Sequence, residues 1–330
     1  MQIVRNTDDC FEKHWRTLWD DSQQQYPLHT PLWGKFYKQQ FSNASVQDLS
    51  FIILKNEEPL FLMLAASFNK ENIRSVSWYG YPVVTIEKTK LTKKEKIFIL
   101  NYTKREIFFD YDSSNFNLSY LDVMAKNQLS LMSEYLIKNK FKQNMVITQV
   151  IDLKATEPEL VAGLRKSYKG EIKWGKNNLS IDIITGDNIT SDCIELFRNL
   201  HISAAGRQTR PNATWDTMQE MVIKREAFCI YGYYLDQLVS ASFFSLSKSV
   251  CIYGVAASNR DMWDKPLGHA LIWEAMIYAK KQGCEWFEMG DVRVAKNILE
   301  NDVQQEKELN ISKFKAGFGG EKYIRIAIKN

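Results

Sequence analysis

The sequence predicts an α/β protein of two domains, in each of which helices flank a mixed, mostly antiparallel sheet. The chain of 330 residues is about twice as long as a typical domain of ~150 residues. Apolar residues recur at helical spacing in some stretches and alternate, as in strands, in others. The same order of elements occurs in each half: two helices, a hairpin with a further strand, a long helix and another strand.

The first half, residues 1–153, begins with two predicted helices. Phe11, Trp15 and Leu18 share one face of the first helix, and the second follows Pro31. Two apolar runs joined by a polar turn then predict a hairpin. We expect these elements at 8–24 and 31–41 (helices), 49–54 and 59–66 (hairpin), 75–79 (strand), 93–109 (helix), 118–121 (strand), 129–139 (helix) and 145–153 (strand).

The second half, residues 154–330, repeats this order. We place the boundary after Leu153, because Thr156 and Pro158 are typical of a new helix start. The basic segment 165–177 contains two glycines and is expected to form a partly helical connector. Later elements are expected at 179–184 (strand), 191–204 and 214–225 (helices), 229–235, 239–246 and 250–256 (strands), 267–282 (helix), and 286–289 and 322–329 (strands).

Composition excludes several classes of protein. An apolar fraction of 45% and a charged fraction of 25% can form a sizeable core and exclude wholesale disorder. Basic residues exceed acidic residues by four, which permits an anionic substrate but does not require DNA. The richest apolar run, residues 59–66, is far shorter than the ~20 residues of a transmembrane helix. Five scattered cysteines and four histidines, none in a metal-ligand spacing, predict reduced thiols and no metal site.

The C-terminal half carries a series of motifs in a specific order. They are Ser242-Phe-Phe-Ser-Leu, Tyr253-Gly-Val-Ala-Ala-Ser258, Pro266 with Leu271-Ile-Trp-Glu-Ala275, the spaced positions Ala279, Gly283, Phe287 and Gly290, and Phe314-Lys-Ala-Gly-Phe-Gly319. Their spacing, together with the order of elements, resembles the FemABX family, the peptidyltransferase-like branch of the GNAT acyltransferase superfamily. The resemblance covers the whole chain in architecture and about residues 242–320 in motifs. It implies that each half is a GNAT-like domain and that the protein is an acyltransferase.

Lys315 is the first catalytic candidate. The glycines that follow it allow a tight turn before the last strand, and a lysine beside this turn can reach into the space between strands. The resemblance implies that Lys315 stabilises the charged tetrahedral intermediate of acyl transfer, with Phe314 as its packing neighbour. A fixed cation suits a developing oxyanion. The alternative is a solvated lysine that flanks a glycine turn.

Two acidic residues at the end of the strand at 286–289 complete the catalytic candidates. Glu288 or Asp291 can accept the proton of an attacking amine, directly or through water. The alternative for Asp291 is an ion pair with Arg293. No Ser–His–Asp set and no Cys–His pair can be identified, which disfavours a covalent intermediate.

The segment Lys265-Pro-Leu-Gly-His-Ala270 opens the predicted helix at 267–282. GNAT enzymes hold the coenzyme A pyrophosphate on backbone N–H groups at this place, so the resemblance implies cofactor binding at Gly268 and Ala270. Lys265 departs from the usual arginine or glutamine, and Pro266 lacks an N–H donor. The alternative is a proline in the first turn and a glycine that allows close packing.

The remaining candidates concern the acceptor. Arg207 and Arg210 lie in the loop between two predicted helices, where guanidinium groups can pair with phosphate. The resemblance implies that this region binds the pyrophosphate of a nucleotide-linked acceptor, and that tyrosines from both domains and a basic residue after an early tryptophan add contacts. The candidates for these contacts are Tyr79, Tyr81, Tyr253 and Lys38. The alternatives are solvated arginines and tyrosines that pack in the core.

We therefore expect an enzyme, an acyltransferase that forms an amide bond. The resemblance implies an aminoacyl-tRNA donor and a nucleotide- or lipid-linked peptidoglycan precursor as acceptor, with no tightly bound cofactor. One alternative is an acyl-CoA-dependent N-acetyltransferase of an amino sugar or amine, and another is an inactive glycan-binding module. We expect a monomer or weak oligomer that is cytoplasmic, and peripheral at the inner membrane face if its acceptor is lipid-linked.

Overall fold

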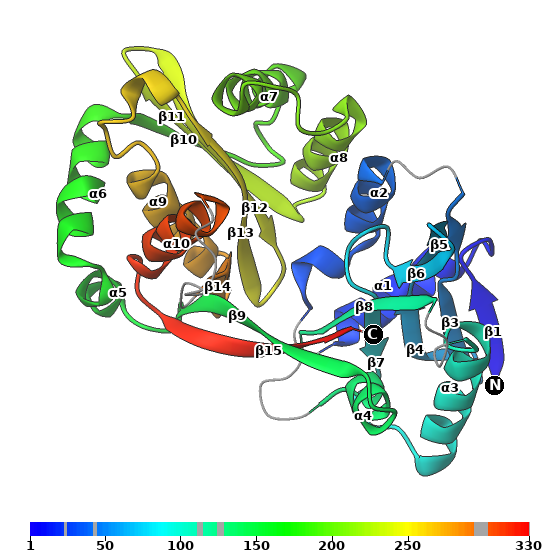
Figure 1. Cartoon of the computed structure of the whole chain (residues 1–330). Helices are drawn as coiled ribbons and strands as arrows, with labels where there is room; N and C mark the ends of the chain where they lie inside the picture. Colours follow the sequence, from blue (N-terminus) through cyan, green and yellow to red (C-terminus); the bar gives the residue numbers. More distant parts are fainter. Residues whose placement is uncertain (23–24, 42–44, 111–114, 124–128, 294–302, 330) are drawn as a thin grey trace. The chain divides into compact units, whose positions relative to one another are not determined.

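The computed structural model describes residues 1–22, 25–41, 45–110, 115–123, 129–293 and 303–329. It shows an α/β protein with mixed, mostly antiparallel sheets and flanking helices, which confirms the predicted fold class (Figure 1). The chain divides into two compact units, which we call unit 1 (Met1–Val146 with Ile324–Asn330) and unit 2 (Ile147–Tyr323). Strands β9 (Lys142–Asp152) and β15 (Glu321–Lys329) each contribute residues to both units.

Unit 1 contains two groups of strands. The first is antiparallel, in the order β1-β3-β4-β7. The second runs β15-β8-β6-β5-β2 and has one parallel pair, β6 with β8. The elements are β1 (Gln2–Arg5), α1 (Phe11–Asp21), η1 (Pro27–His29), α2 (Pro31–Gln40), β2 (Gln47–Asp48), β3 (Phe51–Lys55), β4 (Glu58–Leu64), β5 (Ala66–Lys70), β6 (Ile73–Ser77), β7 (Val84–Glu87), α3 (Lys93–Glu106), β8 (Phe116–Asp122) and α4 (Leu131–Lys138).

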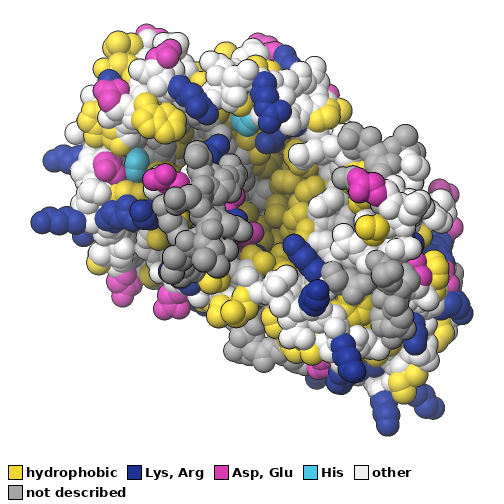
Figure 2. Space-filling model, in the orientation of Figure 1, with side chains coloured by type: hydrophobic (Ala, Val, Ile, Leu, Met, Phe, Trp, Pro, Cys, Tyr) yellow, Lys and Arg dark blue, Asp and Glu magenta, His cyan; other side chains and the backbone are white. Residues whose placement is uncertain are grey.

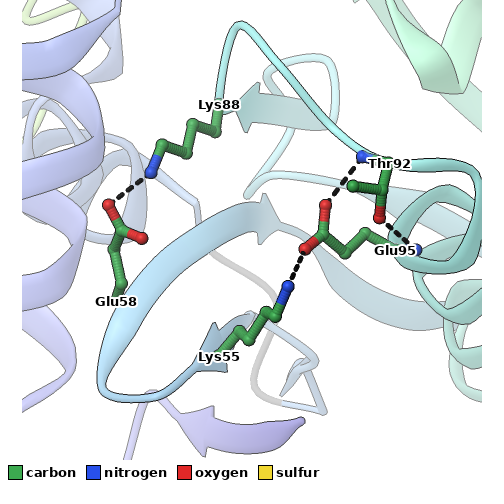
Figure 3. Close-up of polar contacts among 5 residues, drawn as sticks. All are labelled: Lys55, Glu58, Lys88, Thr92 and Glu95. Carbon is green, nitrogen blue, oxygen red and sulfur yellow. Dashed lines mark hydrogen bonds and ion pairs between the residues drawn. The ribbon is translucent and has the colours of Figure 1, made fainter.

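The start of α3 illustrates how local sequence sets the end of an element (Figure 3). The side chain of Thr92 accepts a hydrogen bond from the backbone N–H of Glu95, and the Glu95 carboxylate accepts one from the backbone N–H of Thr92, at 3.3 and 2.7 Å. This capping box satisfies two N–H groups that have no partner within the helix. Lys55 at the end of β3 donates to Glu95 at 2.6 Å, and Lys88 pairs with Glu58, so both charges tie neighbouring elements together.

The strands of unit 2 lie in the order β10-β11-β12-β13-β14-β9, with β15 beside β9. Strands β13 and β14 pair in parallel, while the pairs from β10 to β13 and the pair β14/β9 are antiparallel. The elements are α5 (Glu157–Gly163), α6 (Lys166–Asn178), β10 (Ser180–Ile184), α7 (Ser191–Ala205), α8 (Asn212–Ile223), β11 (Ala227–Tyr234), β12 (Gln237–Leu246), β13 (Val250–Ser258), η2 (Arg260–Met262), α9 (His269–Lys281), β14 (Trp286–Asp291) and α10 (Val303–Ala316).

The basic segment that we expected as a partly helical connector is a regular helix, α6. Tyr168, Ile172 and Gly175 recur at helical spacing on its buried face. A Cβ atom at Gly175 would lie 2.5 Å from the Cβ of Ala270, so the glycine allows α6 to pack closely on the start of α9. Glycine at this position therefore supports packing between two helices and does not interrupt the helix.

Candidate functional site

The two parallel strands of unit 2 pair over only part of their length. β13 and β14 are in register from Val250 and Trp286 to Ile252 and Glu288. Beyond this point β13 continues beside β12 alone, whereas β14 continues beside β9, with a register shift between Glu288 and Gly290. The facing edges of β13 and β14 no longer pair with each other there, and shifts of this kind redirect side chains near active sites.

The side chain of Lys315, which belongs to α10, reaches the end of β14, where β13 and β14 no longer pair. Its Nζ donates a hydrogen bond to the backbone carbonyl of Asp291 at 2.8 Å. A Cβ atom at Gly290 would lie 3.3 Å from the same Nζ, and Gly290 has a φ of +79°. Glycine at this position therefore provides both the left-handed backbone and the space that the lysine side chain occupies.

Glu288 is the buried acid of this group, with 4% of its surface exposed. Its Oε1 accepts a hydrogen bond from Thr148 Oγ1 of β9 at 3.2 Å. Burial lowers the pKa of Lys315, and the negative charges of Asp291 and Glu288 oppose this effect. The structure thus brings three of the four predicted catalytic residues close enough for their charges to interact. They are Lys315, Asp291 and Glu288. Arg293, the alternative partner that the sequence offers for Asp291, forms an ion pair with Glu308 of α10.

The fourth predicted catalytic residue, Phe314, is half-buried in an aromatic cluster. Its ring centroid lies 5.1 Å from that of His269 and 5.4 Å from that of Phe318. The backbone on either side of it is held by the start of α6. Tyr168 donates from its hydroxyl to the carbonyl of Phe314 at 3.0 Å, and Arg165 donates to the carbonyl of Lys313 at 2.7 Å. These bonds satisfy carbonyls in the last turn of α10, which has no intrahelical donors for them.

Tyr253 is the first β13 residue beyond the pairing with β14. Its ring lies 5.6 Å from the ring of Phe244 in β12, and burial raises the pKa of its hydroxyl to about 12. The hydroxyl therefore stays protonated at neutral pH and can act as a hydrogen-bond donor at the point where the strands separate.

The start of α9 places the two predicted cofactor-binding residues differently. Ala270 is fully buried and faces Gly175 of α6, whereas Gly268 is half-buried and has open space where a Cβ would be. Between them, His269 lies 3.0 Å from the Glu171 carboxylate of α6, measured from Nε2 to Oε2. Helix α6 thus covers much of the helix start where a pyrophosphate would be held.

The two predicted phosphate-binding arginines lie on the loop between α7 and α8. Arg207 is exposed. The guanidinium of Arg210 lies 5.2 Å from the ring of Trp215, its Nε is buried without a hydrogen-bond partner among the described residues, and burial lowers its pKa. A cation with an unused donor at a half-buried position can bind an anion.

The remaining candidates belong to unit 1. Lys38 and Tyr79 line the same cavity of about 430 Å³, together with four acidic residues, Asp8, Asp9, Glu12 and Asp48. Tyr79 donates from its hydroxyl to Asp48 at 2.8 Å, and burial raises the pKa of Tyr79. Tyr81 instead stacks on Tyr37, with ring centroids 4.6 Å apart. Of the three, only Lys38 has an exposed side chain.

Sequence reasoning did not identify several residues of this site. Thr148 contacts Glu288, and Tyr168 contacts the helix that carries Lys315. Both lie far from Lys315 in sequence and in no motif of the C-terminal half. The glycine in Trp286-Phe-Glu-Met-Gly-Asp291 was a usable signal, because a glycine inside a strand pattern indicates a bulge or close approach. Among the described residues there is no metal-binding cluster of His, Cys, Asp or Glu. No helix in that part of the chain could cross a bilayer.

Comparisons with known proteins identify the fold. No family model and no curated protein matches the chain. The crystal structure of FemX is similar over 99% of this chain and 97% of its own, with 11% identity and a TM-score of 0.69. L-PGS from Bacillus licheniformis is similar over 99% and 93%, with 10% identity and a TM-score of 0.61. A tandem GNAT protein from the clavulanic acid biosynthesis pathway is similar over 99% and 97%, with 12% identity and a TM-score of 0.53.

At these identities the likeness concerns the fold. The chain therefore has a FemABX/GNAT-like fold, as the order and spacing of its motifs predict.

Proposed function

We propose that this protein is an acyltransferase that forms an amide bond, with Lys315 as the cation that stabilises the intermediate. The observation that carries the proposal is the position of the Lys315 ammonium, half-buried at the point where β13 and β14 part and hydrogen-bonded to the Asp291 carbonyl. An ammonium has three N–H donors, so two remain for a ligand. A partly dehydrated cation acts strongly on a developing oxyanion.

The reaction that suits this arrangement is attack of an acceptor amine on an activated ester. The amine nitrogen bonds to the acyl carbon, the carbonyl oxygen becomes an oxyanion beside Lys315, and the ester oxygen then leaves. Glu288 or Asp291 accepts the proton that the amine loses, and the leaving oxygen receives a proton as the intermediate collapses. Because the ester is already activated, positioning and charge stabilisation are the main contributions of the protein.

An aminoacyl-tRNA is the donor that we propose. The packing of Gly175 against Ala270 supports this choice over acyl-CoA, because α6 covers the helix start that would hold the pyrophosphate. The open space at Gly268 favours the second candidate, an acyl-CoA-dependent N-acetyltransferase, since one part of that helix start stays accessible. The acceptor that we propose is the amine of a cell-envelope precursor, a peptidoglycan precursor or a nucleotide-linked amino sugar, and the site of action is the cytoplasm or the inner membrane face.

A mass-spectrometric transfer assay tests the proposal. The wild-type protein is incubated with a mixture of nucleotide-linked envelope precursors and either charged tRNA or acetyl-CoA. We expect a precursor whose mass increases by one aminoacyl group, only with charged tRNA, and only with an intact Lys315. Acetylation from acetyl-CoA would replace the first candidate by the second. No transfer from either donor would contradict both.

A further inference from the structure

Helix α6 carries a stripe of lysines along its exposed face. Lys166, Lys169, Lys173 and Lys176 are spaced by three, four and three residues, which places them on one side of an α-helix. All four side chains are exposed. We call these four residues the lysine stripe. Tyr168, Ile172 and Gly175 form the buried face of α6, and the lysine stripe lies beside this face on the exposed part of the helix.

Helix α6 and the residue before it carry an excess of positive charge. Residues 165–178 contain five basic residues and one acidic residue, Glu171, an excess of four. The excess in the whole chain is also four, so the rest of the sequence is balanced overall. At the edge of the molecule where α6 lies in Figure 1, Figure 2 shows protruding lysine and arginine side chains. A local concentration of one sign of charge attracts a ligand of the opposite sign.

Most of the stripe is available to a ligand. Lys176 pairs with Glu274 of α9 at 2.8 Å, but no ion pair within the described residues involves Lys166, Lys169 or Lys173. Three of the stripe lysines line a groove of about 260 Å³ next to Trp273, where Glu157 is the acidic residue. Lysines held in a row, most of them outside ion pairs, are suited to a chain of phosphates.

The N-terminal end of α6 contacts the last turn of α10, which carries Lys315. Arg165 and Tyr168, at the N-terminal end of α6, hold the carbonyls of Lys313 and Phe314, which directly precede Lys315. With a rise of 1.5 Å per residue, α6 extends about 20 Å from this point. A ligand that reaches Lys315 with one end can therefore follow the stripe with the remainder of its length.

We infer that the lysine stripe binds the phosphate backbone of the RNA that delivers the acyl group, along its acceptor stem. The inference rests on the proposed function, because it takes the donor to be an aminoacyl-tRNA. An anionic membrane is the competing partner, but a helix that lies on a membrane needs an exposed apolar face. The apolar face of α6, with Tyr168 and Ile172, is buried in unit 2. Charge without an apolar face fits the backbone of a nucleic acid.

Binding of an RNA hairpin to the full-length protein tests the inference separately from transfer. The hairpin has an acceptor-stem helix and a single-stranded 3′ end and carries no amino acid. We expect the double variant Lys169→Glu/Lys173→Glu to raise the Kd at least ~10-fold at 0.1 M salt, and to reduce the slope of log Kd against log salt by about two, since each phosphate contact contributes about 0.9. The matched control is Lys248→Glu/Lys281→Glu, which changes the charge of unit 2 equally at two exposed lysines away from α6 and should leave the Kd unchanged.

The outcomes separate this inference from the proposed function. In the transfer assay we expect the stripe variant to raise KM for charged tRNA while kcat stays unchanged. Active transfer with an unchanged KM and Kd in the stripe variant would overturn the inference alone, and so would no hairpin binding by the wild type. Stripe-dependent hairpin binding without any transfer would support the inference and contradict the function.

Loss of binding to anionic lipid vesicles in the stripe variant, with the hairpin Kd unchanged, would assign the stripe to a membrane. The neutral variant Lys169→Gln/Lys173→Gln, with a smaller effect of the same sign, guards against misfolding.

Discussion

Lys315 and Asp291 are joined by a hydrogen bond of 2.8 Å from the lysine Nζ to the aspartate backbone carbonyl, so the last turn of α10 is tied to the end of β14. Because the backbone carbonyl and not the carboxylate accepts this bond, substitution of the Asp291 side chain leaves it in place. The bond therefore fixes the position of the ammonium independently of the protonation state of the aspartate side chain.

Substitution of Lys315 tests the charge that the mechanism requires. We expect Lys315→Met to lower kcat by about 10²–10³-fold with little change in KM, as for removal of one oxyanion donor in other acyl transfer enzymes. Lys315→Arg should retain part of the activity, because it keeps the positive charge. Steady-state kinetics with the identified donor measure both. An unchanged kcat in Lys315→Met would remove Lys315 from the mechanism.

Gly290 provides a second test, because its φ of +79° and its distance from Lys315 are separate properties. In Gly290→Ala the new Cβ would lie 3.3 Å from the lysine Nζ and would displace it, so we expect both kcat and stability to fall. Gly283→Ala is the matched control, since Gly283 has a φ of +90° and open space around it. Both variants should lose about 1–3 kcal/mol of unfolding free energy through backbone strain. Equal activity in the two variants would show that space at Gly290 does not matter to Lys315.

Tyr168 is expected to act on activity through the position of α10. In Tyr168→Phe the hydrogen bond of 3.0 Å to the Phe314 carbonyl is lost, which should cost about 1 kcal/mol of stability. We expect kcat to fall several-fold while KM for both substrates stays constant, because the hydroxyl acts on the backbone of α10 through the Phe314 carbonyl. Tyr278→Phe, at a half-buried tyrosine of unit 2, is the control and should leave kcat unchanged. A fall in stability without a fall in kcat would make Tyr168 purely structural.

The fold class was predictable because its information is local. Apolar runs joined by polar turns in the hairpins and helical spacing in α7, α8 and α9 are strong patterns, and the structure has elements at those places. The elements that the sequence analysis omitted have weaker patterns. Strands β1 and β7 are four residues long, too short for alternation to be recognised. Helix α10 is rich in Gln, Glu and Lys and has no clear apolar stripe.

The candidate site was predictable as single residues but not as a group. The motifs selected Lys315, Glu288 and Asp291 separately, and their roles remain predictions. Their proximity depends on the register of β14 with β9 and on the packing of α10, which involve residues far apart in the sequence. The contribution of α6 was missed for the same reason, since its contacts with α10 join Tyr168 to Phe314, 146 residues later.

Glu87 is expected to make stability depend on pH. It lies at the end of β7, where its carboxylate accepts a hydrogen bond from the Leu131 amide at 3.2 Å, and burial raises its pKa from about 4.5 to about 7. Between these values the folded protein keeps a proton that the unfolded chain has released, so stability falls as pH rises from about 4.5 to about 7. Glu87→Gln cannot ionise and should remove this fall. Between pH 4.5 and pH 8 the wild type should therefore lose up to about 3 kcal/mol of unfolding free energy that the variant keeps. Urea unfolding at both pH values measures the gain, with the exposed Glu12→Gln as control. A pH dependence in Glu87→Gln as steep as in the wild type would show that Glu87 is ionised in the folded protein.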